Sequence, residues 1–197
     1  MDFKGRKLEE FRSEWPPESS IKEMLSLWKY DHDVYIRNLV EIRQVLDARQ
    51  IPCMLAFGTL LGAIRDAGPC EGDQDVDLMV TEEHEDKLVE LWLENQFLPE
   101  PSFCSMGFKI VRVSNHMVTV MKDNCYVDIY IFRKKPDDVD DGMHWCCWQY
   151  RIDDWRVINP WTMNLHGLRW NIPGQPEGYL DRVYGHWRVP ANRHASS

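Results

Sequence analysis

Two carboxylates with regular spacing are the first candidates for chemistry. Asp75 and Asp77 occupy alternate positions where the run Asp73-Gln74-Asp75-Val76-Asp77-Leu78 enters an apolar stretch. Alternate residues of a β-strand share a face, so these two side chains should point the same way. Carboxylates this close repel unless a cation lies between them, and Mg²⁺ accepts a few carboxylates while keeping positions for water and phosphate oxygens. The pair therefore predicts a metal site; the alternative is an exposed acidic strand end.

A third carboxylate, Asp128, interrupts the apolar run Tyr126-Val127-Asp128-Ile129-Tyr130-Ile131-Phe132. An acidic side chain inside such a strand needs a partner or a function, because burying an unpaired charge is costly. If a neighbouring strand brings Asp128 beside Asp75 and Asp77, it completes the metal site or takes the proton from an attacking hydroxyl. The alternative is an ion pair with a buried Arg or Lys.

Gly58 and Thr59 lie between a short apolar run and a predicted helix. Backbone N–H groups at a helix N-terminus suit phosphate oxygens, and the missing side chain of a glycine permits close approach. The pair is therefore a candidate phosphate-binding turn. The alternative is an ordinary strand–helix turn in which Thr59 caps the helix.

The elements that would position these residues follow from the hydrophobic pattern. Helical spacing predicts a first helix that begins after Ser19-Ser20 and ends at residues 49–52, and other helices over residues 60–65, 82–95 and 177–184. Apolar runs predict strands over residues 53–57, 76–80, 108–113, 117–121 and 126–132. A charged loop is expected over residues 134–141. This order predicts an α+β fold, a mixed β-sheet flanked by helices.

The last third of the chain is rich in Trp and Pro and predicts an irregular C-terminal region. Six of the nine Trp residues lie at or after Trp145. Aromatic faces can surround a quaternary ammonium group such as choline, and the alternative is a small aromatic core. His144, Cys146 and Cys147 could supply metal ligands, but they lack the paired spacing of a zinc ribbon. Buried small side chains are the alternative for these thiols.

Composition and charge set the remaining limits. The 197 residues predict a single domain over residues 20–190, with a polar N-terminal arm over residues 1–19 and a flexible tail over residues 191–197. The net charge of -9 argues against a nucleic-acid partner. No membrane span is expected, and the start lacks the apolar run of a signal peptide, which predicts a cytoplasmic location and reduced thiols. The alternative is that the chain is a domain of a longer protein.

The motifs together resemble the nucleotidyltransferase superfold and, within it, the LicD family, which includes bacterial phosphocholine transferases and is related to the fukutin proteins. The resemblance extends over most of the chain from Phe57 to Pro190 and rests on residues 57–65, Gly68 and residues 73–77, 126–130, 168–173 and 179–187. The sequence departs from the family at Glu71-Gly72, where Pro-Trp is usual, and at Gln74, where a third Asp is usual.

The resemblance implies a reaction. A CDP-linked alcohol, such as CDP-choline or CDP-ribitol, would transfer its phosphorylated alcohol to a hydroxyl of a glycan and release CMP. Mg²⁺, or Mn²⁺, would bind Asp75, Asp77 and Asp128, with Asp128 activating the acceptor. Gly58-Thr59 would hold phosphate oxygens, and Arg65 would pair with a phosphate or lock the acidic loop. Two alternatives stay open: transfer of a nucleoside monophosphate from an NTP to a small molecule or protein, and a catalytically silent nucleotide-binding module.

Overall fold

The computed structural model describes residues 2–3, 6–7, 31–71, 73, 75–93, 101–136, 143–147 and 149–190. The predicted start of the first helix, after Ser19-Ser20, and the predicted tail over residues 191–197 lie outside this part. So does most of the predicted N-terminal arm, apart from the strands β1 (Asp2–Phe3) and β2 (Arg6–Lys7). None of the helices described is long and apolar enough to cross a membrane.

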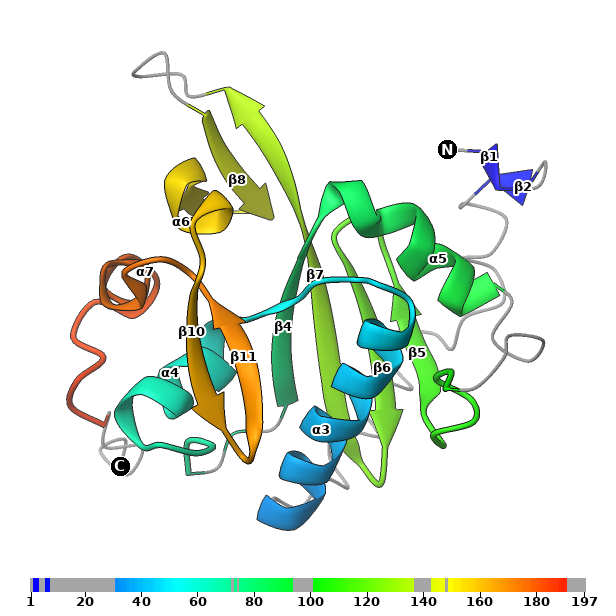
Figure 1. Cartoon of the computed structure of the whole chain (residues 1–197), viewed down its shortest axis with the longest axis horizontal. Helices are drawn as coiled ribbons and strands as arrows, with labels where there is room; N and C mark the ends of the chain where they lie inside the picture. The colour runs from blue at the N-terminus through cyan, green and yellow to red at the C-terminus, as the bar shows by residue number, and fades with distance from the viewer. Residues whose placement is uncertain are drawn as a thin grey trace, which may run out of the picture.

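A mixed β-sheet forms the centre of the described structure (Figure 1). Its strands lie in the order β10-β11-β3-β4-β7-β6-β5. In chain order they are β3 (Met54–Leu55), β4 (Asp75–Thr81), β5 (Lys109–Val113), β6 (Met117–Lys122), β7 (Cys125–Pro136), β10 (Trp161–Leu165) and β11 (Leu168–Ile172). The two long central strands, β4 and β7, are parallel, whereas β5, β6 and β7 pair antiparallel. The α+β fold predicted from the sequence is confirmed.

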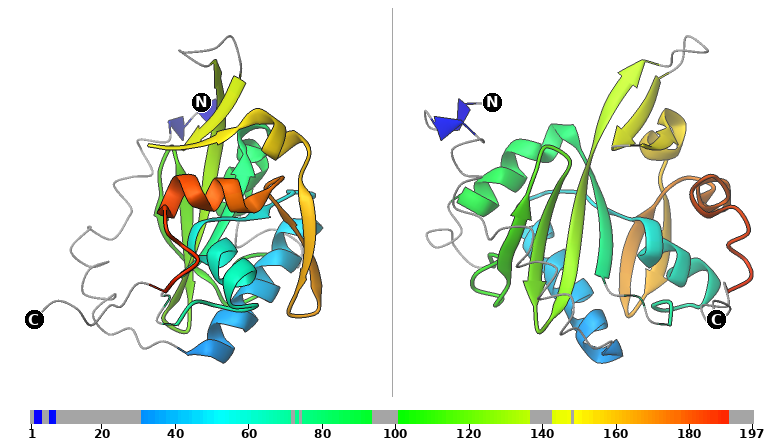
Figure 2. Two further views of the ribbon diagram at one scale, coloured as in Figure 1. Left: turned by 90° about the vertical axis from the view of Figure 1, so that its left-hand side faces the viewer. Right: turned by 180° about the vertical axis from the view of Figure 1, so that it is seen from behind.

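Helices cover one face of this sheet more fully than the other. Helix α3 (His32–Ala48) begins after Asp31, whose carboxylate accepts the N–H groups of two residues in the first turn. The helix packs on β4 and β7, and Figure 1 shows it with α5 (Glu85–Leu93) on the near side of the sheet. Seen from behind, β5, β6 and β7 are not crossed by a described helix (Figure 2). That less covered face bears the candidate site.

Two further helices lie in the half of the molecule that contains β10 and β11 (Figure 1). Helix α4 (Phe57–Arg65) packs on β4 and α7 (Pro176–Tyr184) packs on α4. Phe57 was predicted to end a strand, but it begins α4 instead, with the left-handed φ of 38°. Such a φ is unfavourable for a bulky side chain. The Phe57 ring packs on Tyr130 and Tyr150, each with 4.6 Å between ring centroids, and these contacts hold the turn.

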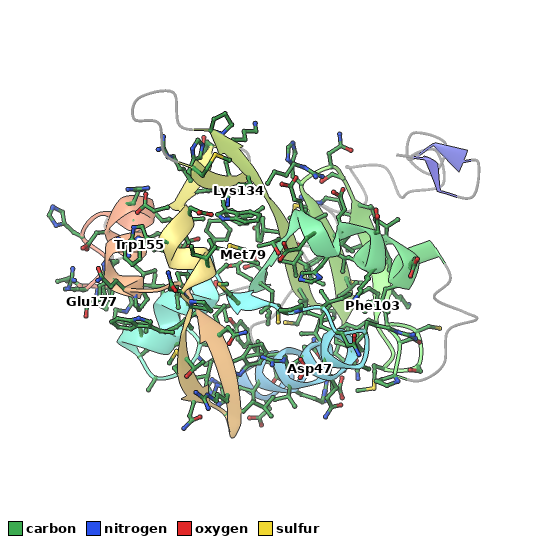
Figure 3. All side chains as sticks on the ribbon, turned by 45° about the horizontal axis from the view of Figure 1, so that its top comes forward. Asp47, Met79, Phe103, Lys134, Trp155 and Glu177 are labelled. Carbon is green, nitrogen blue, oxygen red and sulfur yellow. The ribbon has the colours of Figure 1, made fainter. Side chains whose placement is uncertain are left out.

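The C-terminal third is more regular than its sequence predicts. It contains β8 (Met143–Cys147), β9 (Tyr150–Asp153) and α6 (Asp154–Ile158) before β10, β11 and α7. Strand β7 also continues to Pro136, so the expected charged loop begins later than predicted, and residues 137–142 lie outside the described part. The side chains of this region, including Trp155 and Glu177, are drawn in Figure 3.

The tryptophans of the C-terminal region divide into two groups. Trp145, Trp170 and Trp187 are buried, which fits an aromatic core, whereas Trp155 and Trp161 are 40% and 54% exposed. The neighbouring thiols do not form a metal centre with His144: among the described residues, only a group of carboxylates has metal-ligand spacing. Cys147 is buried and its Sγ donates to the His116 carbonyl. The small-side-chain alternative therefore describes Cys147.

Candidate active site

The three predicted carboxylates meet at the centre of the sheet. Asp75 and Asp77 lie on β4 and Asp128 on β7, where the parallel pairing places Asp77 directly beside Asp128. One carboxylate oxygen from each residue lies within 4.8 Å of the other two. Hard oxygen ligands in so small a group suit Mg²⁺, which binds oxygens at about 2.0–2.1 Å. The three carboxylates therefore form a group that could hold a metal ion.

The first turn of α4 fixes Asp77 through three hydrogen bonds. The Ala56 N–H donates to the Asp77 carbonyl at 3.1 Å, and the Gly58 N–H donates to the Asp77 carboxylate at 2.9 Å. The Asp77 N–H in turn donates to the Thr59 hydroxyl oxygen at 2.8 Å, and the Tyr35 hydroxyl of α3 lies 2.6 Å from the same oxygen. Asp77 thus occupies the anion-binding position that a helix N-terminus offers.

This arrangement bears on the predicted phosphate contacts. The Gly58 N–H and the Thr59 hydroxyl are directed at Asp77, and Thr59 is buried. Phosphate binding by these two residues stays a prediction, and it would require them to share or exchange these bonds. In the structure, Gly58 and Thr59 position Asp77.

A fourth carboxylate, Asp73, lies beside the cluster, next to Gly58. A Cβ at Gly58 would lie 2.9 Å from one Asp73 carboxylate oxygen and 3.2 Å from an Asp77 oxygen. The acidic residues therefore approach the helix as closely as a glycine allows. Sequence reasoning did not include Asp73 among the site residues, although it precedes Asp75 and Asp77 at the same alternate spacing.

Asp128 is held from two sides on the sheet. The Thr119 hydroxyl on β6 donates to Asp128 Oδ1 at 2.5 Å, and the Tyr130 side chain also forms a hydrogen bond with Asp128. Neither residue was predicted as a site residue. The signal was available only in part, because Tyr130 shares the strand face of Asp128 but Thr119 comes from a neighbouring strand.

Burial and mutual repulsion raise the pKa values of the carboxylates. Burial raises the pKa of Asp77 well above its ordinary value, and the charges of Asp75, Asp128 and Asp73 raise it further. Burial is also the main cause that raises the pKa of Asp128, to about 6, against the lowering effect of its bond with Thr119. Burial raises the pKa of Asp75 as well. A bound divalent cation would stabilise the ionised form of these carboxylates, which is otherwise disfavoured.

Tyrosine side chains lie close to the carboxylates. Burial, followed by the charges of Asp77, Asp128 and Asp75, raises the pKa of Tyr130. Burial and the Asp77 charge likewise raise the pKa of Tyr184, on α7. These phenols therefore stay protonated, and they can offer hydrogen bonds but no negative charge.

Arg65 lies at the other end of α4 from Gly58. Its guanidinium donates to both carboxylate oxygens of Asp66, to the Cys70 sulfur at 3.4 Å and to the Trp187 carbonyl at 3.3 Å. Of the two predicted roles, these contacts fit the locking of the loop that leads to the acidic strand. Pairing of Arg65 with a phosphate stays a prediction.

Comparison with known proteins agrees with this fold. Residues 50–174 match the LicD/FKTN/FKRP, nucleotidyltransferase domain family. The uncharacterized protein RT0683 of Rickettsia typhi is 28% identical over 172 residues, which are 85% of this chain and 48% of RT0683. This chain therefore spans about half the length of that relative.

Solved structures resemble this chain at low sequence identity. The lincosamide antibiotic adenylyltransferase LnuA, solved with lincomycin, superposes with a TM-score of 0.50 and 12% identity over 80% of this chain and 90% of that one. The antibiotic-resistance factor ANT(2'')-Ia gives a TM-score of 0.48 and 12% identity over 82% of this chain and 79% of that one. The likeness to LnuA shows a shared fold alone. The family model matches residues 50–174, which are more than half of this chain. This chain therefore belongs to the LicD/FKTN/FKRP family, through its nucleotidyltransferase domain.

Proposed function

We propose that this protein is a Mg²⁺-dependent phosphotransferase. It moves a phosphorylated alcohol, of the phosphocholine or ribitol phosphate type, from a CDP-linked donor to a hydroxyl of a glycan and releases CMP. The observation that carries the proposal is the meeting of Asp75, Asp77 and Asp128 on β4 and β7 in a member of this family. The family and the fold are those of transferases of nucleotide or phosphate-containing groups, which supports the reaction type.

The residues present fit the proposed metal. The group contains carboxylates and neither His nor Cys, which favours a hard cation such as Mg²⁺ or Mn²⁺ over zinc. A site of three carboxylates leaves coordination positions for water and for phosphate oxygens. When bound, the cation supplies neutralisation of the diphosphate and of the charge that develops on the leaving CMP.

The side chains of the site would accept the proton of the acceptor hydroxyl and orient the reacting groups. In the proposed reaction the acceptor oxygen forms a bond to the phosphorus that carries the alcohol, and the bond from that phosphorus to the oxygen shared with CMP breaks. The electron pair of the broken bond stays on CMP. The proton of the acceptor hydroxyl goes to a carboxylate, which we assign to Asp128, because Thr119 fixes its orientation.

A donor panel tests this proposal. The protein is incubated with CDP-choline, CDP-ribitol, CTP or ATP, with Mg²⁺ or with a chelator, and thermal melting and CMP release are measured. We expect one CDP-alcohol to raise the melting temperature and to yield CMP only when Mg²⁺ is present. Asp77→Asn should lose both effects, whereas Asp47→Asn, exposed on α3, should keep them.

Two results would contradict the proposal. Transfer of label from ATP, with no CMP from either CDP-alcohol, would favour the nucleotidyltransferase alternative. Nucleotide binding that needs Mg²⁺ but survives both Asp75→Ala and Asp77→Ala unchanged would favour a silent nucleotide-binding module.

A further inference from the structure

An arginine outside the predicted site shares its face of the sheet. Arg112 on β5 pairs with Thr119 on β6, Thr119 pairs with Asp128 on β7, and Asp128 pairs with Asp77 on β4. Residues directly opposite one another on neighbouring strands have side chains on the same face. The four residues therefore form one row across the sheet, with the guanidinium of Arg112 at one end and the carboxylates of Asp128 and Asp77 at the other.

A β-bulge places Arg112 in this row. The register shifts by one residue between Ile110 and Arg112, so that Arg112 stands opposite Thr119 where an unbroken register would place Val111. Val111 and Val113 are buried instead. Bulges commonly re-aim a side chain next to a functional site.

The contacts of Arg112 leave most of its guanidinium available. Its Nη1 donates to the Met117 sulfur at 3.4 Å, which confirms that the side chain extends along β6 on the face of Thr119. A thioether is a weak acceptor and carries no charge. Within the described part of the chain, Arg112 makes no salt bridge.

The Arg112 charge nevertheless reaches the carboxylate cluster. Burial is the main cause that raises the pKa of Asp75, and the Arg112 charge is the strongest influence in the opposite direction. The charge also lowers the pKa of Asp128. The guanidinium of Arg65, by contrast, already donates to both carboxylate oxygens of Asp66.

We propose that Arg112 binds a phosphate oxygen of the donor, whose diphosphate lies between the carboxylate cluster and the guanidinium. This inference rests on the proposed function, since it names a donor-binding residue of the same site. Carboxylates alone repel a diphosphate, and a guanidinium on the same face offers the paired N–H groups that phosphate oxygens accept.

Calorimetric titration with CDP, in the presence of Mg²⁺, measures the contact without requiring turnover. Relative to the wild type, Arg112→Met should weaken CDP binding roughly 10- to 100-fold, as expected for loss of a charged hydrogen bond. Arg112→Lys keeps the charge but not the paired donors, so it should fall between the two. Lys87→Met removes the same charge from an exposed position on α5, on the helix-covered side of the sheet, and should change CDP binding by less than about 3-fold.

A second titration, with Mg²⁺ and no nucleotide, separates donor binding from simple charge compensation. If Arg112 binds the donor, Arg112→Met leaves Mg²⁺ affinity unchanged or tightens it while CDP binding falls. Equal CDP binding by wild type and Arg112→Met overturns the inference and leaves the proposed function intact. Equal losses in Arg112→Met and Lys87→Met also overturn it, because the effect is then long-range. A wild-type protein that binds no CDP overturns the proposed function and this inference with it.

Discussion

The two faces of the β4–β7 pair are built from the same strands and have opposite properties. One face presents six apolar side chains that are 1% exposed or less: Val76, Leu78, Val80, Val127, Ile129 and Ile131. The other face presents Asp75, Asp77 and Asp128, whose pKa values are raised by burial and, for Asp77 and Asp128, also by neighbouring carboxylates. Single-residue alternation thus separates the core from the candidate site.

The comparison shows where stability and function are located. Fully burying one aliphatic side chain contributes roughly 1.5–3 kcal/mol, so the apolar face stabilises the domain. The acidic face, without a cation, opposes folding at neutral pH. Variants of neighbouring residues on β4 should therefore have opposite effects on stability and on ligand binding.

The sharpest contrast, and the largest expected effect, comes from Asp77→Asn. Removing a metal ligand should reduce CMP release by about a thousand-fold or more, because bound metals contribute several kcal/mol to such transition states. The same change should stabilise the metal-free protein by about 1 kcal/mol, since it removes a buried charge and keeps an acceptor for the Gly58 N–H. Turnover and urea unfolding measure the two effects. A metal-free variant that is less stable than wild type would contradict the proposed separation.

Leu78→Ala tests the other face of the same strand. Leu78 is fully buried, so its truncation should lower the free energy of unfolding by about 2–5 kcal/mol. The folded fraction should bind Mg²⁺ with nearly the affinity of the wild type, because the side chain points away from the carboxylates. Urea unfolding and calorimetry give both values, and Ile158→Ala, at an exposed position, serves as the control. A large loss of metal affinity in Leu78→Ala would show that the two faces are not independent.

Gly58→Ala should affect both properties, since Gly58 joins α4 to the acidic face. The new methyl group would press on the carboxylates of Asp73 and Asp77, which must move, and we expect a cost of about 1–2 kcal/mol. Mg²⁺ affinity should fall with it. Gly68→Ala is the matched control, because nothing lies within 4 Å of a Cβ at that position. Equal changes in melting temperature and in Mg²⁺ affinity in the two variants would show that the close approach at Gly58 does not cause these changes.

The smallest effect is a pH dependence of the stabilisation by Mg²⁺. In the folded protein the pKa of Asp128, about 6, and that of Asp77 are raised. In the metal-free protein, the stability that these two groups contribute to the fold is therefore lost as the pH rises from about 4 through the folded pKa values. A cation must displace these protons to bind. The rise in melting temperature with Mg²⁺ should therefore be larger near pH 7.5 than near pH 5. Asp77→Asn should flatten this difference, and a constant rise across the range would count against the site.

Local patterns predicted much of this molecule. The alternation of β4 and β7 was sufficient to assign both faces, and the three carboxylates that it singled out do converge. Helical spacing likewise found α7, and α3 except for its start, which Asp31 sets. The alternation and the helical spacing depend on residues close together in the chain, whereas the convergence of Asp128 with Asp75 and Asp77 also needs the pairing of β4 with β7.

Features that depend on cross-strand register were missed. Thr119 and Arg112 reach the site only through the pairing of β5, β6 and β7 and through the bulge, none of which one sequence reveals. The β10–β11 hairpin could have been found. Its turn, His166-Gly167, has positive φ at both residues, and two-residue turns of this kind, with Gly second, are typical of hairpins.

The parallel pairing of β4 with β7 also has a consequence for folding kinetics. The pairing joins residues 75–81 to residues 126–132, whereas β6 and β7 follow each other directly through a tight turn. Short-range hairpins form before long loops close, so we expect Asp128 to meet the β4 carboxylates late in folding. A cation that needs all three ligands should then slow unfolding and leave the folding rate nearly unchanged. It would lengthen the lifetime of the finished domain without helping to form it.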